Sequence, residues 1–103
     1  MKYLVSWKTR FDGSAAENEA SAARILEVYN KWAPEPDVTI HQFVLRADGQ
    51  GGFAVTESDN PTAGFLSIFK LAPFAEYEVY PVLDIEEGVG LYAEAIEWRK
   101  SIT

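Results

Sequence analysis

The chain has 103 residues, of which 48% are hydrophobic and 14% aromatic, and it carries no cysteine and a formal net charge of −7. This composition is sufficient for one folded domain over 1–103, and it excludes disulfides, thiolate catalysis and thiolate-held metal centres. The acidic balance, without a cluster of Lys and Arg, argues against nucleic acid and anionic membranes as partners. The N-terminal segment lacks the long apolar run of a signal peptide or membrane span, so we expect a cytoplasmic protein.

The first third of the chain predicts a strand and then a helix. Aromatic and β-branched residues alternate with polar ones over 2–9, which is typical of a strand. Ser14 and Glu17 have the spacing of a capping box, which predicts the start of a helix over about 15–33. Its apolar stripe consists of Ala22, Ile25, Leu26, Tyr29 and Trp32.

The remainder predicts a hairpin, a helix, a strand and a final helix. The expected strands cover 38–47, 53–58 and 76–84, and the glycine-rich segment between the first two suits a hairpin turn. Asn60 and Pro61 predict the start of a short helix that ends near Pro73. Pro81 places the last strand at a sheet edge, or at a bulge. Asp84 and Glu87 repeat the capping pattern before a helix that reaches about Ser101, with Leu91, Ala95, Trp98 and Ile102 as its stripe.

This element order is the β-α-β-β-α-β of an α+β, ferredoxin-like fold with an extra C-terminal helix. Strict alternation in the second strand puts Val38, Ile40 and Val44 on one face and Phe43 and Leu45 on the other. The fourth strand likewise has Tyr80 and Val82 opposite Tyr77, Val79 and Leu83. Because both faces of the sheet are apolar, we expect a homodimer through the open sheet face; the C-terminal helix is the alternative cover.

Four segments carry a resemblance to a small bacterial family, the domain of unknown function 3303. They are 1–7, 39–43 (Thr-Ile-His-Gln-Phe), 51–55 (Gly-Gly-Phe-Ala-Val) and 79–85 (Val-Tyr-Pro-Val-Leu-Asp-Ile). The resemblance implies membership of the dimeric α/β-barrel superfamily, in which two ferredoxin-like sheets close one barrel. That superfamily includes cofactor-independent monooxygenases, isomerases and cyclases as well as ligand-sensing domains, so it implies no single activity.

His41 is the only histidine and the first candidate for proton transfer. In the predicted register it shares a face with Phe43 and points into the barrel, where Tyr80 is a candidate helper. Ser6, Lys8 and Glu78 are expected in the same cavity, so we predict His41 and Tyr80 as catalytic and Ser6, Lys8, Phe43 and Glu78 as ligand-binding residues. The alternatives are that His41 is a half-buried structural histidine and that Lys8 and Glu78 are solvent-facing strand ends. A register error of one residue would move the side chains of each strand to the other face of the sheet.

We expect no metal or other cofactor, because one histidine and no cysteine do not make a ligand set for zinc or iron. The three tryptophans are interpreted as core or interface residues and not as a binding cage. Two functions remain: a dimeric module that binds a small apolar or aromatic molecule or is purely structural, and a cofactor-independent enzyme for an aromatic or polyketide-like substrate with His41 as base.

Overall fold

A computed structural model describes residues 1–102 of the chain. In chain order, its elements are β1 (Lys2–Thr9), α1 (Ala15–Lys31), β2 (Thr39–Leu45), β3 (Gly51–Glu57), α2 (Pro61–Leu71), the 3-10 turn η1 (Ala72–Phe74), β4 (Ala75–Val82) and α3 (Ile85–Lys100). This is the predicted βαββαβ order with an additional C-terminal helix. The differences from the predicted bounds are confined to the ends of elements.

The strands form one antiparallel sheet in the order β2-β3-β1-β4. This order is that of a ferredoxin-like fold, in which β1 lies in the centre and pairs with both β3 and β4. The prediction for Pro81 is confirmed, because β4 is an edge strand and does not need that amide as a donor on its free side.

The sequence predicts the starts of α1 and α3 correctly, but the predicted capping hydrogen bonds form only at α1. The capping box of α1 is formed, with the Ser14 hydroxyl accepting from the Glu17 amide and Glu17 accepting from the Ser14 amide. Asp84 is the N-cap residue of α3, as predicted, but the predicted capping hydrogen bond is not formed, because its side chain makes no bond to the backbone of α3. Instead its carboxylate accepts from Lys2 Nζ at 2.7 Å, which ties the start of α3 to the first residue of β1.

A β-bulge at His41 overturns the predicted faces of β2. Ile40 is paired with Thr56, and the register then skips to Gln42 opposite Val55 and Phe43 opposite Ala54. Because the extra residue shifts the alternation by one position, Ile40 and Phe43 lie on the same face of the sheet. The prediction that His41, Phe43 and Leu45 share a face opposite Ile40 is therefore wrong.

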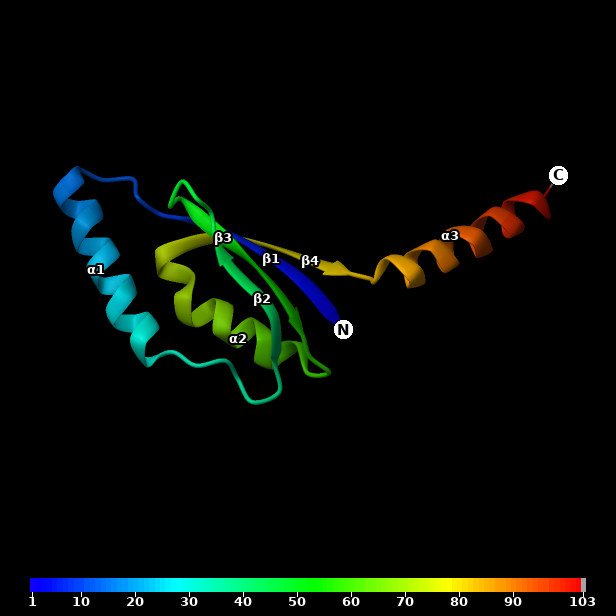
Figure 1. The fold of residues 1–103 in the computed structure, drawn as a ribbon, viewed down its shortest axis with the longest axis horizontal. Coiled ribbons are helices and arrows are strands. Elements are labelled where there is room, and N and C mark those ends of the chain that lie inside the picture. Colours follow the sequence, from blue (N-terminus) through cyan, green and yellow to red (C-terminus); the bar gives the residue numbers. More distant parts are fainter. Residues whose placement is uncertain (103) are drawn as a thin grey trace.

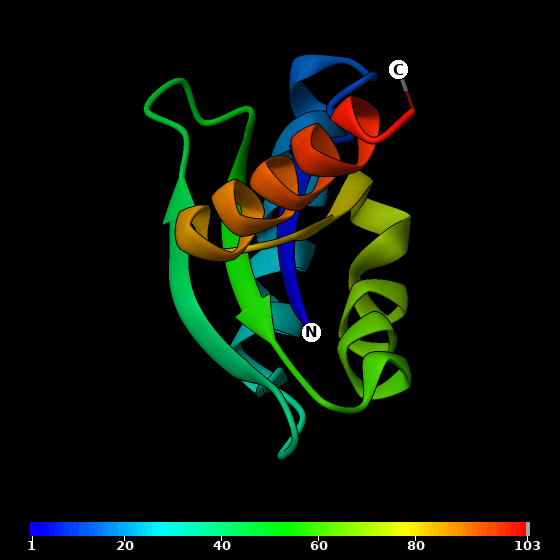
Figure 2. The ribbon, with the colours of Figure 1, turned by 90° about the vertical axis from the view of Figure 1, so that its right-hand side faces the viewer.

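Helices α1 and α2 lie over one face of the sheet, whereas α3 projects away from the other elements (Figure 1). Seen from the end of the molecule that α3 occupies, α3 lies in front of the strands and α1 behind them (Figure 2). The molecule measures 64 × 30 × 20 Å and has a radius of gyration of 18.2 Å. A compact chain of this length would have a radius of gyration of about 13 Å. The difference reflects the projecting α3.

The buried core of this chain is small. Among the described residues, the buried hydrophobic side chains are Val5, Ala54 and Ala75, all of them on the sheet. Helices α1, α2 and α3 contain no buried residue. Much of the 48% hydrophobic content therefore lines an internal space or lies on the surface.

Gly51 and Gly52 permit a close approach of β3 to the neighbouring strands. A Cβ atom at Gly51 would overlap the carbonyl oxygen of Trp7, and one at Gly52 would lie 2.5 Å from the Trp7 ring. The Trp7 indole thus covers the glycine backbone directly opposite it in the sheet. This arrangement positions the indole on the face that α1 and α2 cover.

We predict that Gly51→Ala lowers the free energy of unfolding by about 1–3 kcal/mol, because the added methyl group overpacks a closed backbone contact. Gly88→Ala is the matched control: nothing lies within 4 Å of its Cβ position in α3, and alanine is the better helix former, by about 1 kcal/mol. Urea denaturation followed by circular dichroism measures both variants. Equal stability of the two variants would contradict the close contact.

Candidate functional site

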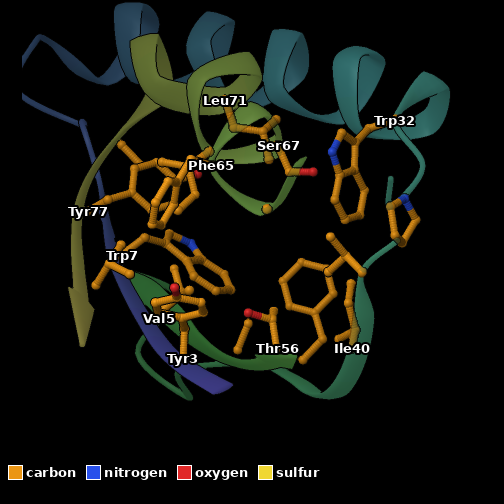
Figure 3. A pocket seen from close by; sticks show the side chains of 18 of the residues that line it. Tyr3, Val5, Trp7, Trp32, Ile40, Thr56, Phe65, Ser67, Leu71 and Tyr77 are labelled. Carbon is orange, nitrogen blue, oxygen red and sulfur yellow. The ribbon is translucent and has the colours of Figure 1, made fainter. Parts of the chain in front are cut away.

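A largely apolar cavity of about 340 Å³ lies between the sheet and helices α1 and α2. This volume is in the range of small-molecule binding sites, which is roughly 300–1,000 Å³. Figure 3 shows its labelled side chains pointing inward from the strands below and the helices above. The aromatic residues among its walls are Tyr3, Trp7, Tyr29, Trp32, Phe43, Phe65, Phe74 and Tyr77.

Phe43 is the centre of an aromatic cluster at one end of this cavity. Its ring lies 5.5 Å from Trp7, 6.2 Å from Tyr29 and 6.0 Å from Trp32, measured between ring centroids. Tyr29 and Trp32 stack on one another at 5.8 Å with an interplanar angle of 22°. These geometries are the favourable edge-to-face and stacked arrangements of aromatic pairs. The bulge in β2 makes the cluster possible, since it turns Phe43 toward α1.

The described lining of the cavity carries no acidic, basic or imidazole side chain. Among the described residues that line it there is no Asp, Glu, His, Lys or Arg, and the tyrosine hydroxyls are its only titratable groups. Burial raises the pKa of the Tyr77 hydroxyl above its ordinary value, so this phenol stays protonated at neutral pH. The site is therefore uncharged and hydrogen bonds are its only polar interactions.

Two buried polar atoms of the cavity wall have no hydrogen-bond partner. They are the indole nitrogen of Trp32 and the hydroxyl oxygen of Ser67, and both residues line the cavity. Trp32 is the C-cap of α1, in extended conformation before Pro34, and its backbone amide donates to the carbonyl of Tyr29. Ser67 lies in the middle of α2. In Figure 3 the Trp32 nitrogen and the Ser67 oxygen point toward one another.

His41 lies on the open face of the sheet, away from the cavity. Its Nε2 is 2.8 Å from the Glu57 carboxylate, and Glu57 is opposite Lys2 in the sheet. The hydrogen bond with His41, followed by the charge of Lys2, holds the pKa of Glu57 below its usual value. This pair is exposed to solvent, with 42% of the His41 side chain and 49% of the Glu57 side chain accessible.

The structure brings some of the other predicted site residues together and separates the rest. Ser6 is opposite Glu78 in the sheet, and the Tyr80 hydroxyl donates to the Glu78 carboxylate. This hydrogen bond raises the pKa of the Tyr80 hydroxyl above its ordinary value. Lys8 lies further along the same face of β1, opposite Glu76.

His41 and Tyr80 are on strands at opposite edges of the sheet, β2 and β4. At about 4.8 Å per strand, three strand spacings put them roughly 14 Å apart. Phe43, predicted to share their cavity, lines the space on the other side of the sheet. The catalytic roles of His41 and Tyr80 stay predictions.

Trp32 and Ser67 are not evident as cavity residues from the sequence alone. Trp32 falls on the apolar stripe of its helix, where a core residue is the ordinary interpretation. The available signal is Ser67, a hydroxyl within the apolar run Phe65-Leu66-Ser67-Ile68-Phe69. Trp98, also interpreted as a core or interface residue, is 65% exposed within this single chain.

Two kinds of feature, a membrane-spanning helix and a group of metal-binding side chains, are absent from the described part of the chain. None of the helices within residues 1–102 combines the length and the hydropathy that a membrane-spanning helix requires. The same residues contain no group of three or more His, Cys, Asp or Glu side chains arranged to hold a metal ion.

We predict that the pKa of Glu57 rises toward its ordinary value in His41→Ala, because the variant removes the main group that stabilises the carboxylate. A depressed pKa in the folded state stabilises the fold above the unfolded-state pKa, and this stabilisation is lost as the pH falls through the folded value. Carboxyl NMR titration measures the change. Asp48 is the internal control, since its pKa is lowered chiefly by the Gln50 amide. An unchanged pKa of Glu57 in His41→Ala would contradict the hydrogen bond between the two side chains.

Several solved structures have a similar backbone arrangement. A protein of Nitrosomonas europaea named as a candidate antibiotic biosynthesis monooxygenase has a TM-score of 0.47 and 10% identity, over 82% of this chain and 100% of that one. SCO4226 from Streptomyces coelicolor A3(2) has a TM-score of 0.42 and 14% identity, over 80% and 98% of the two chains. SnoaB, a cofactor-independent oxygenase from Streptomyces nogalater, has a TM-score of 0.39 and 16% identity, over 81% and 92%. These similarities are too weak to assign a function.

No curated protein is significantly similar to the chain in sequence. The family resemblance carried by the four segments is confirmed, since the model of one family matches residues 1–96, nearly the whole chain. The chain belongs to the family described as domain of unknown function (DUF3303).

Proposed function

We propose that this protein binds a small, apolar, uncharged molecule in the cavity between the sheet and helices α1 and α2, and that it does so as a homodimer. The observation that carries the ligand proposal is the aromatic-lined space of about 340 Å³. Binding sites for small molecules have this character: mostly apolar walls, several aromatic side chains and few polar groups.

The packing of the chain supports a ligand as the natural content of this space. Protein interiors are normally packed as densely as organic crystals, with few voids larger than a water molecule. Here the helices contribute no buried residue, and aromatic rings such as Phe65 remain 39% exposed. A bound aromatic molecule would bury these walls, at about 25 cal/mol for each Å² of apolar surface removed from water.

The chemistry of the walls favours binding over catalysis. General acid–base catalysis requires a titratable group within hydrogen-bonding reach of the substrate. The described lining of this cavity offers only tyrosine hydroxyls, and His41 is hydrogen-bonded to Glu57 on the opposite side of the sheet. An enzyme that used His41 and Tyr80 would need its substrate on the open face, which is the surface assigned below to the second copy.

We predict that naphthalene, an uncharged fused-ring hydrocarbon, binds in this cavity. Two-dimensional ¹H–¹⁵N NMR resolves an indole signal for each of the three tryptophans. The signals of Trp7 and Trp32, which line the cavity, should move on titration. The signal of Trp98 is the internal control, because this residue lies on α3 outside the cavity. Single Trp→Phe variants assign the signals.

The naphthalene titration separates specific binding from adhesion to apolar surface. Saturable shifts of the Trp7 and Trp32 indole signals, with an unchanged Trp98 signal, support the proposal. Shifts at all three tryptophans, or shifts that do not saturate, would count against a defined site.

The homodimer proposal follows from two apolar surfaces that this chain leaves uncovered. The open face of the sheet has one apolar central row, formed by Leu4, Val55 and Tyr80. In the next row Val44 and Phe53 are apolar, and Ser6 and Glu78 are polar. Most charged residues lie at the two ends of this face: Lys2 and Glu57 at one end, and Lys8 and Glu76 at the other. Glu78 lies nearer the centre, where its carboxylate accepts from the Tyr80 hydroxyl. An apolar centre with a charged rim is the usual anatomy of a protein interface.

Helix α3 is the second uncovered surface. Tyr92 is 74% exposed and Trp98 is 65% exposed, so the helix leaves large apolar side chains without cover by its own chain. The alternative prediction, that α3 folds over the open sheet face of its own chain, is not what the structure has (Figure 1). A second copy of the chain provides partners for both surfaces under one two-fold axis.

We predict a mass of twice the 11.5 kDa of the chain in light scattering at micromolar concentration. Phe53→Asp should yield the single-chain mass, because it buries an unpaired carboxylate in the centre of the proposed interface. Phe69→Asp is the matched control: Phe69 is 74% exposed on α2 and does not belong to the sheet. A wild-type mass of one chain would rule out the dimer, and dissociation by both variants would rule out the sheet face as its specific interface.

A further inference from the structure

We infer that Trp32 and Ser67 together form a hydrogen-bonding anchor for a carbonyl oxygen of the bound molecule, so that the ligand is an uncharged aromatic carbonyl compound. The inference rests on the proposed binding function and names the ligand class of the same cavity. It begins from two polar atoms, the indole nitrogen of Trp32 and the hydroxyl oxygen of Ser67, that are buried without a partner.

Buried polar groups in native proteins nearly always have a hydrogen-bond partner, and each exception requires an explanation. Ser67 lies in mid-helix, where a serine hydroxyl often bonds to the carbonyl four residues earlier. It forms no such bond here. Trp32 could likewise have pointed its nitrogen to solvent. A ligand oxygen would satisfy both groups once the two side chains part to admit it, because neither atom is accessible in the empty cavity.

The chemistry of the two groups identifies the ligand atom. An indole N–H is a donor only, so it requires an acceptor, and a serine hydroxyl can donate as well. The two side chains come from different elements, α1 and α2, and face one another across part of the cavity (Figure 3). A carbonyl oxygen has two lone pairs and can accept from both sides at once.

The rest of the cavity determines the remainder of the ligand. No described lining residue carries a positive charge, so a carboxylate or phosphate would lose its hydration without a counter-ion. The stacked and edge-to-face rings around Phe43 offer faces and edges suited to a planar aromatic body. Trp32 is itself held by Tyr29 and Phe43, so its N–H is preorganised before the ligand arrives.

The test compares two probes of nearly equal shape, 2-acetylnaphthalene and 2-isopropenylnaphthalene. Only the first carries a carbonyl oxygen in place of a methylene group. Their dissociation constants are measured for the wild-type protein and for Ser67→Ala by titration of the indole NMR signals. Because the ratio between variants is compared for each probe, the different hydration of the two probes cancels.

We expect Ser67→Ala to raise the dissociation constant of the ketone by about 2- to 10-fold, the usual net effect of one neutral hydrogen bond. The hydrocarbon should bind both proteins equally. The Trp32 indole proton should move downfield with the ketone and not with the hydrocarbon. Ser67→Ala should also fold normally, because it removes a hydroxyl that has no partner in the free protein.

Ser6→Ala is the matched control for the serine substitution. Ser6 lies on β1, opposite Glu78, outside the lining of the cavity. It was also predicted from the sequence as a ligand-binding residue. Loss of ketone affinity in Ser6→Ala but not in Ser67→Ala would contradict the role of Ser67 and would indicate that the ligand binds at the open face.

The remaining outcomes separate the inference from the proposed function. If both probes bind and Ser67→Ala affects them equally, the anchor is wrong while the cavity remains a binding site. If neither probe moves the Trp7 and Trp32 signals, the proposed function fails and the anchor fails with it.

Discussion

The packing of Phe43 against Trp7, Tyr29 and Trp32 is the interaction on which the site depends. It joins β2 to β1 and to the last turn of α1, so it sets where that helix lies over the sheet. Large rings meeting edge to face keep the backbones apart, and the space beside them becomes the cavity. With smaller side chains at these positions, α1 could approach the strands and the cavity would close.

The sheet separates two kinds of chemistry in this chain. The face under α1 and α2 is apolar and uncharged, and its unsatisfied polar atoms belong to Trp32 and Ser67. The open face has an apolar row between charged ends, with Glu78 beside that row, and at one end His41 is hydrogen-bonded to Glu57. Since successive side chains of a strand point to opposite faces, one short strand serves both surfaces at once.

Because the buried core is small, the proposed ligand and the proposed second copy would contribute to stability as well as to function. With three buried hydrophobic side chains among the described residues, an isolated, empty chain leaves much apolar surface in water. Anything that binds only the folded state stabilises it in proportion to the logarithm of its concentration over its dissociation constant. The fold, the bound molecule and the partner copy are thus thermodynamically linked in this proposal.

The sequence by itself determined the element order, the capping box at Ser14 and the edge position of Pro81, because the patterns that predict them involve residues only a few positions apart. It also determined the family, through the resemblance of four segments. Only the tertiary structure decided which residues share a surface. A single bulge at His41 moved Phe43 across the sheet, because an alternation of period two reverses when one residue is inserted. Asp84 bonded to Lys2, distant in sequence, and not to its own helix. The placement of Trp32 and Ser67 toward one another likewise depends on how two separate helices lie over the sheet, which no local pattern encodes.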